Sequence, residues 1–402
     1  MPTALNSRLI TYYLETHCGG HRLEFAAHFV AFFQSIDREG EPVCLLLHPD
    51  LAKHLPAACG TLEVRAIPAD VMRRLEATGS LWRRSELEMQ YLESVLAPGD
   101  HVILSDLDRY QLALGLRRFR RVRYTVSGVL LKPYCQLPRT TWTYRRQRLR
   151  KYLQLRWILG NRAVKAAFIL NDAEAARHLN ATRSLRAVFS PLPDPVATHR
   201  YRLIDIRQRY GIAPHRAVLL VIGGIQRKKN IGRVIVAMTK LPPPVQQRTT
   251  LLILGRCQNE ALLAELRAEI AAVDPGVCIQ LHDQFVDADL FESALATAAM
   301  VLAVYINSYC SSGIIGQAAK HDTPTVATKN GVIGRTVRAY RLGCTVDELS
   351  ETDISRGIQQ LLAGAPSDSR AARYVAEHSP HHFVGQLLAS AYGSAPSAYA
   401  VT

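Results

Sequence analysis

The sequence predicts an α/β protein made of two doubly wound domains, each with a parallel sheet. At 402 residues the chain is too long for one ordinary domain. Apolar strand-like segments alternate with helical segments in both halves, which is typical of βαβ units. A proline-rich segment at 190–196, SPLPDPV, interrupts this alternation. We therefore expect a domain over 1–189, a linker over 190–196, a second domain over 197–375, and a terminal helix and tail over 376–402 that packs back on the first domain.

The first half contains strand-like apolar segments separated by amphipathic helices. Strands are expected at 9–14, 42–47, 62–67, 101–104, 122–126 and 166–170, and helices at 21–36 and 85–96. In such sheets ligands gather at the carboxyl ends of the strands. Four residues follow predicted strands and should share one rim: Gly19, Gly20, His21 and Asp106.

The second half repeats the alternation. Strands are expected at 217–222, 250–254, 277–281, 300–304 and 325–327 and near Cys344, and helices at 230–239, 261–273, 290–298, 313–319 and 331–340. The last helical segments are expected at 358–362, 371–378 and 383–391. No short repeat appears, so two doubly wound halves are the large-scale organisation.

The chain is organised around the segment 305–319, YINSYCSSGIIGQAA, whose first part, 305–313, we call the serine loop. It follows an apolar strand, and Ser311, Ser312 and Gly313 open a helix of small and apolar residues. A helix N-terminus carries partial positive charge and free N–H groups, so a phosphate is its natural ligand. The two hydroxyls can cap the helix or donate to the ligand. The alternative is an ordinary capped helix with no ligand.

A second loop, 223–229, follows the strand at 217–222 and is called here the basic loop. It begins with Gly223 and Gly224 and ends with Arg227, Lys228 and Lys229. It fits neither G-x-x-x-x-G-K-[ST] nor G-x-G-x-x-G, so it is not a P-loop or a standard dinucleotide site. Two positive loops on one rim suit a diphosphate. Fixed cations there would stabilise the charge that develops on a leaving diphosphate.

A basic helix interrupts the alternation at 139–165. It carries nine Lys and Arg residues together with Trp142, Tyr144, Tyr152 and Trp157. One interpretation is a helix that rests on anionic lipid, with Arg117, Arg118, Arg120, Arg121 and Arg123 enlarging its basic surface. The alternative is a solvated helix that packs its apolar stripe on its own domain. Nucleic acid is disfavoured because no nucleic-acid-binding module is recognised.

Composition narrows the class of protein. The chain has 49 Lys and Arg against 34 Asp and Glu, a net charge of +15, which suits an anionic partner. The eight cysteines form no C-x-x-C pair, so we expect free thiols and no zinc site. The N-terminal sequence lacks a signal-peptide pattern, and no apolar run is long enough to span a membrane. These features predict a cytoplasmic protein, peripheral on the inner face of the membrane if the basic helix binds lipid.

The second half resembles glycosyltransferase family 4. The resemblance covers about 218–362 and includes LLVIGGIQRKKNIGRVIVAM, IQLHDQFV and SSGIIGQAAKHDTPTVATKNGVIG. It implies a retaining sugar transferase of the GT-B fold, with two Rossmann-like domains facing each other across a cleft. It also implies that an Arg and a Lys of the basic loop bind the donor diphosphate. Lys229 matches the Lys, whereas Gly224 stands where the family has Arg, so Arg227 or Lys228 would substitute.

The chain departs from the family at its Glu-x7-Glu signature, where it has Tyr309 and Gln317. The resemblance implies that Gln317 contacts the donor ribose through a neutral hydrogen bond and that Tyr309 lies near the transferred sugar. Donor-base contacts are expected near Arg256, Gln284 and Phe285. No D-x-D motif is present, so no metal or other cofactor is expected.

The predicted function is transfer of a sugar from a UDP- or GDP-sugar to a hydroxyl of a glycan, lipid-linked or small-molecule acceptor. In such retaining transfer the donor phosphate itself takes the acceptor proton. Lys229 and Arg227 would stabilise the leaving diphosphate, and Asp106 or His21 would orient the acceptor. Asp106 could instead cap a helix at 107–116, and His21 could be a surface residue. The alternative functions are a catalytically idle nucleotide-binding scaffold of the same fold and a sugar-nucleotide epimerase.

Overall fold

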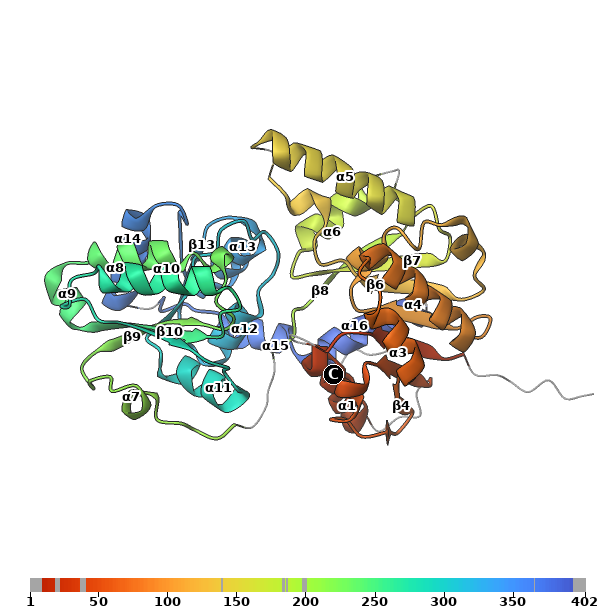
Figure 1. Cartoon of the computed structure of the whole chain (residues 1–402), viewed down its shortest axis with the longest axis horizontal. Helices are drawn as coiled ribbons and strands as arrows, with labels where there is room; N and C mark the ends of the chain where they lie inside the picture. The colour runs from red at the N-terminus through yellow and green to blue at the C-terminus, as the bar shows by residue number, and fades with distance from the viewer. Residues whose placement is uncertain are drawn as a thin grey trace, which may run out of the picture. The chain divides into compact units, whose positions relative to one another are not determined.

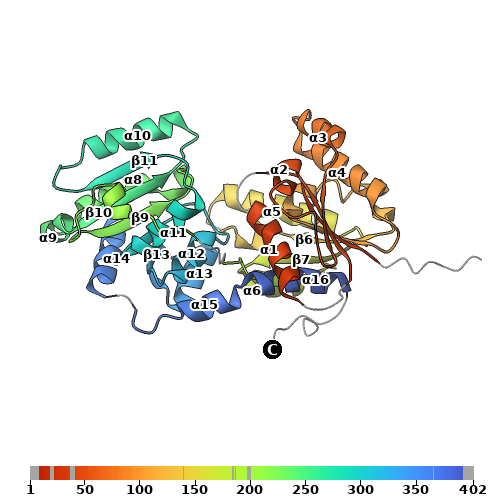
Figure 2. The same ribbon diagram turned by 90° about the horizontal axis from the view of Figure 1, so that it is seen from below.

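The computed structural model describes residues 9–18, 22–36, 41–138, 140–182, 185, 187–196, 201–364 and 366–392. The chain forms two compact units (Figures 1 and 2). The first comprises Met1–Pro193 and Ser379–Thr402, and the second comprises Asp194–His378. Each is a Rossmann-like α/β unit with a mainly parallel sheet, so the predicted fold class is confirmed.

The first unit contains a sheet of order β3-β4-β2-β1-β5-β6-β7-β8, in which only the β3–β4 pair of the described strands is antiparallel. Its strands are β1 (Thr11–Glu15), β2 (Val43–Leu47), β3 (Ala58–Cys59), β4 (Leu62–Ala66), β5 (His101–Leu104), β6 (Thr125–Val129), β7 (Val164–Leu170) and β8 (Val188–Leu192). Its helices are α1 (Arg22–Ser35), α2 (Pro49–Ala52), α3 (Ala69–Glu76), α4 (Leu81–Val95), α5 (Trp142–Ile158), α6 (Ala173–Asn180) and α16 (Pro380–Tyr392), with short 3₁₀ turns η1 (Leu107–Tyr110), η2 (Arg117–Arg121) and η3 (Tyr134–Gln136).

Helices cover both faces of this sheet because successive strand side chains point to opposite sides. Tyr13, Leu45 and Ile103 pack with α1 and α16, whereas their strand neighbours pack with α3, α4, α5 and α6. The last helix returns to this unit, where the rings of Phe25 and Phe383 lie 5.0 Å apart. Helix α16 therefore completes one face of the first unit, whereas the expected tail at 393–402 lies outside the described residues.

Three local expectations for this unit were wrong. The linker expected at 190–196 begins inside β8, which pairs in parallel with β7 and forms the edge of the sheet. The strand expected at 122–126 forms three residues later, as β6. The helix expected at 107–116 is only the 3₁₀ turn η1. In each case tertiary packing, which the local pattern does not contain, decides where the element lies.

The second unit contains a fully parallel sheet of order β11-β10-β9-β12-β13-β14. Its strands are β9 (Ala217–Ile222), β10 (Thr249–Gly255), β11 (Ile279–Asp283), β12 (Met300–Ala303), β13 (Thr325–Thr328) and β14 (Gly343–Val346). Its helices are α7 (Ile206–Arg209), η4 (Arg227–Lys229), α8 (Ile231–Thr239), α9 (Pro243–Gln247), α10 (Glu260–Ala271), α11 (Ala288–Thr297), α12 (Gly313–Lys320), α13 (Gly331–Tyr340), α14 (Glu351–Ala363) and α15 (Ala371–Glu377). The strand order reverses between β9 and β12.

All eight cysteines are free thiols, as expected from their spacing. Among the residues that the structure describes, no helix is both long enough and apolar enough to cross a lipid bilayer.

Candidate functional site

The site lies at the reversal of strand order in the second unit. In open parallel sheets this is where the loops at the carboxyl ends of the strands separate and leave room for a ligand. The basic loop follows β9 and the serine loop follows β12. The two loops touch, since the amide of Ile306 donates to the carbonyl oxygen of Lys228 at 2.9 Å. The structure thus brings together the two segments predicted to bind phosphate.

Lys229 is the buried cation of this site. Its side chain is 8% exposed, and its Nζ donates to the carbonyl oxygen of Ile222, the last residue of β9. The same nitrogen lies 5.5 Å from the ring centroid of Tyr305. Gly223 has a φ of 87°, and a Cβ there would lie 3.4 Å from Nζ. No carboxylate is paired with Lys229 among the described residues, so its charge is compensated only by a carbonyl dipole and an aromatic face.

The N-terminus of α12 differs from the expected serine cap. Ser312 occupies the cap position, but within the described residues its hydroxyl makes no capping hydrogen bond. Ser311 instead donates to Asp194 Oδ2 at 2.8 Å. The expected cap from the Ser312 hydroxyl is therefore not seen among the described residues. A Cβ built on Gly313 meets nothing within 4 Å, so the first turn of the helix borders open space.

Gln317 lies within α12, whereas Tyr309 lies in the serine loop before the helix. The Gln317 Oε1 atom is buried and has no hydrogen-bond partner among the described residues. Such an atom is uncommon, because a buried acceptor without a partner costs free energy. The carbonyl oxygen of Tyr309 accepts from Val332 at 3.2 Å, and a Cβ on Gly331 would lie 2.8 Å from the Tyr309 Cα. The serine loop is therefore packed closely on the start of α13.

Arg227 and Lys228 diverge from Lys229. Arg227 is 62% exposed and forms an ion pair with Glu265 of α10 at 2.8 Å. It lines a cavity of about 390 Å³ together with Arg233, Glu265 and Glu269. Lys228 is exposed, and its carbonyl oxygen holds the serine loop. Of the three adjacent cations, Lys229 alone is buried at the end of β9.

The residues expected near the donor base lie on neighbouring loops. Gly255, at the end of β10, approaches Gly223 so closely that a Cβ would lie 2.2 Å from the Gly223 oxygen. The next residue, Arg256, is exposed, and its carbonyl oxygen accepts from the basic loop. Gln284 donates from Nε2 to the Tyr210 hydroxyl at 2.5 Å, and Phe285 is 79% exposed. An exposed aromatic ring beside these loops is free to stack on a base.

Asp106 follows β5 in the first unit and is partly buried. Its Oδ1 atom has no hydrogen-bond partner among the described residues. Burial raises the pKa of this carboxyl to about 6; Asp108 raises it further, while Arg109 and Arg22 oppose the shift. The alternative role of helix cap is not seen, since the described residues give Asp106 no capping bond to η1. Gly19, Gly20 and His21 lie outside the described residues.

A buried charged network near Asp106 escaped the sequence analysis. Glu88 of α4 is fully buried and accepts hydrogen bonds from Thr16 Oγ1 at 2.6 Å and from Arg109 at 2.9 Å. Arg84 forms an ion pair with the same carboxylate at 3.3 Å. The spacing of Arg84 and Glu88, one helical turn, was the available signal. The expected helix began at 85 and therefore left Arg84 out.

Residues 204–378, nearly the whole second unit, match the family described as glycosyl transferases group 1. The second unit is a glycosyltransferase group 1 domain. No curated protein matches the chain significantly. The match decides the class of enzyme: the chain is a glycosyltransferase.

Solved structures similar to the whole chain show the same GT-B fold. WaaG, a glycosyltransferase involved in lipopolysaccharide biosynthesis, is 14% identical with a TM-score of 0.60, covering 95% of this chain and 98% of WaaG. The trehalose-6-phosphate synthase OtsA is 9% identical with a TM-score of 0.69 and coverages of 96% and 99%. An E. coli structure described as trehalose-6-phosphate bound with UDP-2-fluoro glucose is 8% identical with a TM-score of 0.70 and coverages of 96% and 99%. At these identities the likeness shows the fold alone.

Proposed function

We propose that this glycosyltransferase moves a sugar from a UDP- or GDP-sugar to an acceptor hydroxyl, with retention of configuration and without a metal ion on the donor. The second unit binds the donor at the reversal point between β9 and β12, and Asp106 in the first unit orients the acceptor. The observation that carries the proposal is Lys229, a buried ammonium without a carboxylate partner among the described residues.

A buried ammonium is costly unless an anion or several hydrogen bonds compensate it. The ammonium group has three donors, and the contact with Ile222 uses one of them. A donor diphosphate would accept the others and supply the missing negative charge. As the glycosidic bond breaks, the charge on the leaving diphosphate grows, so the interaction strengthens in the transition state. Lys229 would thereby contribute to catalysis as well as to binding.

The N-terminus of α12 and the Gln317 side chain would supply uncharged contacts to the same donor. The open side of Gly313 lets an oxygen of the diphosphate approach the first amides of α12. The buried Gln317 Oε1 would accept a hydrogen bond from a ribose hydroxyl and so gain the partner that it lacks among the described residues. A similar fold with bound UDP-2-fluoro glucose supports a uridine donor as the first to test.

Nucleotide titration tests the donor site. Calorimetry with UDP, GDP and ADP should show binding of one of them, and Lys229→Ala should weaken it by about 10- to 100-fold through loss of a charge-assisted contact. Lys228→Ala is the matched control, because Lys228 is exposed and offers only its carbonyl to the loop. If Lys229→Ala weakened the binding of the nucleoside as much as that of the nucleoside diphosphate, the assignment of Lys229 to the diphosphate would be contradicted. Absence of binding by all three nucleotides would favour the idle scaffold, and donor conversion without acceptor would favour the epimerase.

Helix α5 supports a second part of the proposal, peripheral attachment of a cytoplasmic enzyme to an anionic membrane. Trp142, Leu149 and Leu153 are 78%, 59% and 53% exposed. Leu149 lies seven residues after Trp142 and four before Leu153, a spacing that puts the three on one face of the helix with the exposed Arg146 and Arg150. Inward packing of the whole apolar stripe, the alternative interpretation, therefore does not hold for these residues. Exposed aromatic and aliphatic side chains flanked by arginines suit the interface of an anionic bilayer.

A further inference from the structure

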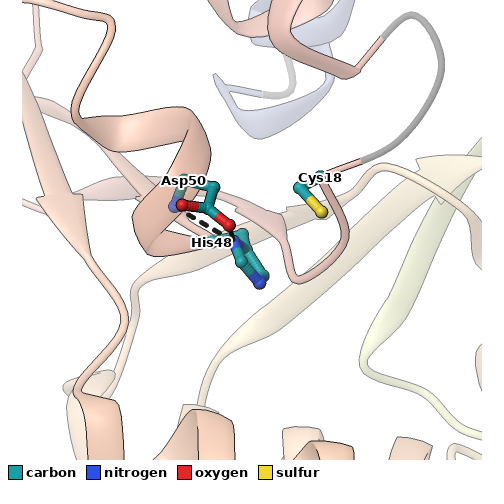
Figure 3. Close-up of side chains that lie close together, drawn as sticks. All are labelled: Cys18, His48 and Asp50. Carbon is teal, nitrogen blue, oxygen red and sulfur yellow. Dashed lines mark hydrogen bonds and ion pairs between the residues drawn. The ribbon is translucent and has the colours of Figure 1, made fainter.

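Three side chains of metal-binding type meet in the first unit, where β1 and β2 end. Cys18 follows β1, whereas His48 and Asp50 follow β2 (Figure 3). A sulfur, an imidazole nitrogen and a carboxylate oxygen, one from each residue, all lie within 4.8 Å of one another. Donor and acceptor binding as proposed above use none of these groups.

The sheet itself positions the three residues. Strands β1 and β2 are parallel neighbours, and Glu15 pairs in register with Leu47. The next amide, that of His48, donates to the carbonyl oxygen of Glu15 at 2.8 Å. The juxtaposition therefore depends on backbone pairing and on residues close to the strand ends.

The surroundings of His48 resemble those of a metal-binding histidine. Its side chain is 12% exposed, with Nδ1 3.8 Å from Asp50 Oδ2 and Nε2 3.6 Å from Glu76 Oε1 of α3. A histidine that binds metal through one nitrogen commonly directs the other toward a carboxylate, which orients the ring. Lys53 holds the second carboxylate oxygen of Asp50 at 2.7 Å. At present Nδ1 accepts from the Asp50 amide at 3.0 Å, a contact that metal binding through Nδ1 would replace.

We propose that Cys18, His48 and Asp50 bind one divalent transition-metal ion of the Zn²⁺ class. A thiolate combined with an imidazole and a carboxylate suits zinc, whereas Mg²⁺ and Ca²⁺ prefer oxygen ligands alone. Ligand atoms around tetrahedral zinc lie roughly 3.3–3.8 Å apart, so the groups close by about 1 Å on binding. Cys18 is exposed and can make this adjustment. Three protein ligands leave one position for water or a ligand hydroxyl.

The proposed site differs from the expectation, drawn from cysteine spacing, that the chain offers no zinc site. The ligands are far apart in the sequence, and only the pairing of β1 with β2 brings them together. The ion would tie the segment after β1 to α2. Because Cys18 directly precedes Gly19 in the sequence, it would also constrain the segment from which acceptor contacts are proposed. That consequence rests on the proposed function, but the metal binding does not.

Cobalt and zinc titrations test the proposal on the full chain, stripped of metal with a chelator and kept reduced. Co²⁺ should bind at one equivalent with a near-ultraviolet thiolate-to-cobalt absorption band, and Zn²⁺ should displace it. Cys18→Ser should abolish the band and weaken zinc binding at least tenfold. Cys59→Ser, which changes a partly buried cysteine on β3 of the same unit, should leave both unchanged.

Two further measurements do not depend on the cysteine variants. Asp50 is exposed, so Asp50→Asn should fold normally and yet bind zinc more weakly, while His54→Gln, at an exposed histidine nearby, should not. Zinc should also slow alkylation of Cys18 in the unaltered protein, read by peptide mass spectrometry. A cobalt band that persists in Cys18→Ser, or alkylation of Cys18 that zinc leaves unchanged, overturns the proposal. Nucleotide titration of the same samples keeps this outcome separate from the donor proposal.

Discussion

The Lys229 ammonium and the Tyr305 ring lie 5.5 Å apart at the reversal point of the second sheet. The ring ends the apolar segment after β12, and the cation ends the basic loop after β9, so this contact joins the two loops of the donor site. A cation over an aromatic face is partly stabilised, but much less than a cation paired with an anion. The arrangement predicts that the ligand-free site is a source of instability.

Lys229→Met is therefore expected to keep or raise the melting temperature of the ligand-free protein. Methionine has a similar length and buries no charge, so the desolvation cost disappears. The same variant should lose most of the melting-temperature increase that the bound nucleoside diphosphate gives the unaltered protein. Differential scanning calorimetry with and without ligand measures both effects. A fall of several degrees without ligand would mean that Lys229 is needed for the fold itself.

Gln317→Leu should reduce affinity for a ribonucleoside diphosphate by about 1 kcal/mol, because one neutral hydrogen bond is lost. Affinity for the 2′,3′-dideoxy analogue should change little. Gln317→Glu should instead tighten ribose binding, since a carboxylate accepts a stronger hydrogen bond. Calorimetric comparison of the two nucleotides checks both variants. Equal losses for both nucleotides in Gln317→Leu would place Gln317 away from the ribose.

Much of the fold follows from local sequence. The strand segments of the second unit, such as 217–222, are buried on both faces and therefore read as continuous apolar runs. The ends of strands and helices follow less closely from local sequence where packing against the rest of the fold decides them. The segment 122–126 alternates Val122, Tyr124 and Val126 with polar residues, yet the paired strand is Thr125–Val129, because its register against β5 is set across the sheet. Sequence pattern alone contains no such cross-strand information.

The candidate donor site could be predicted in part from the sequence. Loops after strands were identified by glycines and charges, but the directions of their side chains were not. Arg227, Lys228 and Lys229 look alike in sequence, and only the fold distinguishes the buried Lys229 from Arg227, which pairs with Glu265. The hydroxyl of Ser311 similarly binds Asp194, a partner distant in the chain. Long-range partners of this kind cannot be inferred from spacing within one loop.

Asp106 should make stability depend on pH. Its folded pKa of about 6 lies above the unfolded value, so the folded state holds its proton more tightly. Stability contributed by the protonated form is complete below about pH 4 and is lost as pH rises toward 6, by up to about 3 kcal/mol. Asp106→Asn should therefore stabilise the protein relative to wild type at pH 7 but not at pH 4. Denaturant midpoints across this range measure the difference.

The matched control is Asp70→Asn, at an exposed aspartate near the start of α3. Any change with pH that this variant shares with Asp106→Asn does not come from Asp106. If the Asp106→Asn difference is flat relative to this control, the carboxyl does not titrate near pH 6. Transfer activity offers a separate readout, because an ionised Asp106 that orients the acceptor would make the rate rise through pH 6.

Glu88→Ala should be strongly destabilising, by about 3–5 kcal/mol, because it leaves two partly buried arginines without their shared, fully buried carboxylate. Thr16 would also lose its 2.6 Å hydrogen bond. Glu86→Ala on the same helix is the comparison, since its partners Arg83 and Arg118 are 59% and 44% exposed. Glu86→Ala should lower the free energy of unfolding by less than about 1 kcal/mol. Urea unfolding of both variants measures the difference, and similar losses would show that the buried network does not stabilise the first unit.

Helix α5 should require both its apolar and its basic residues to bind membranes. Leu149→Asp with Leu153→Asp removes two exposed leucines and adds negative charge, so binding to anionic vesicles should fall at least tenfold. Arg146→Gln with Arg150→Gln should weaken binding by about 1 kcal/mol per arginine and remove most of its salt dependence. Leu203→Asp, at a leucine in the second unit that is 72% exposed, controls for general surface polarity. Sedimentation with phosphatidylglycerol-containing and purely zwitterionic vesicles provides the measurement. Unchanged sedimentation of both α5 variants would exclude this helix as the lipid-binding surface, while loss only in the leucine variant would indicate an apolar partner and not an anionic one.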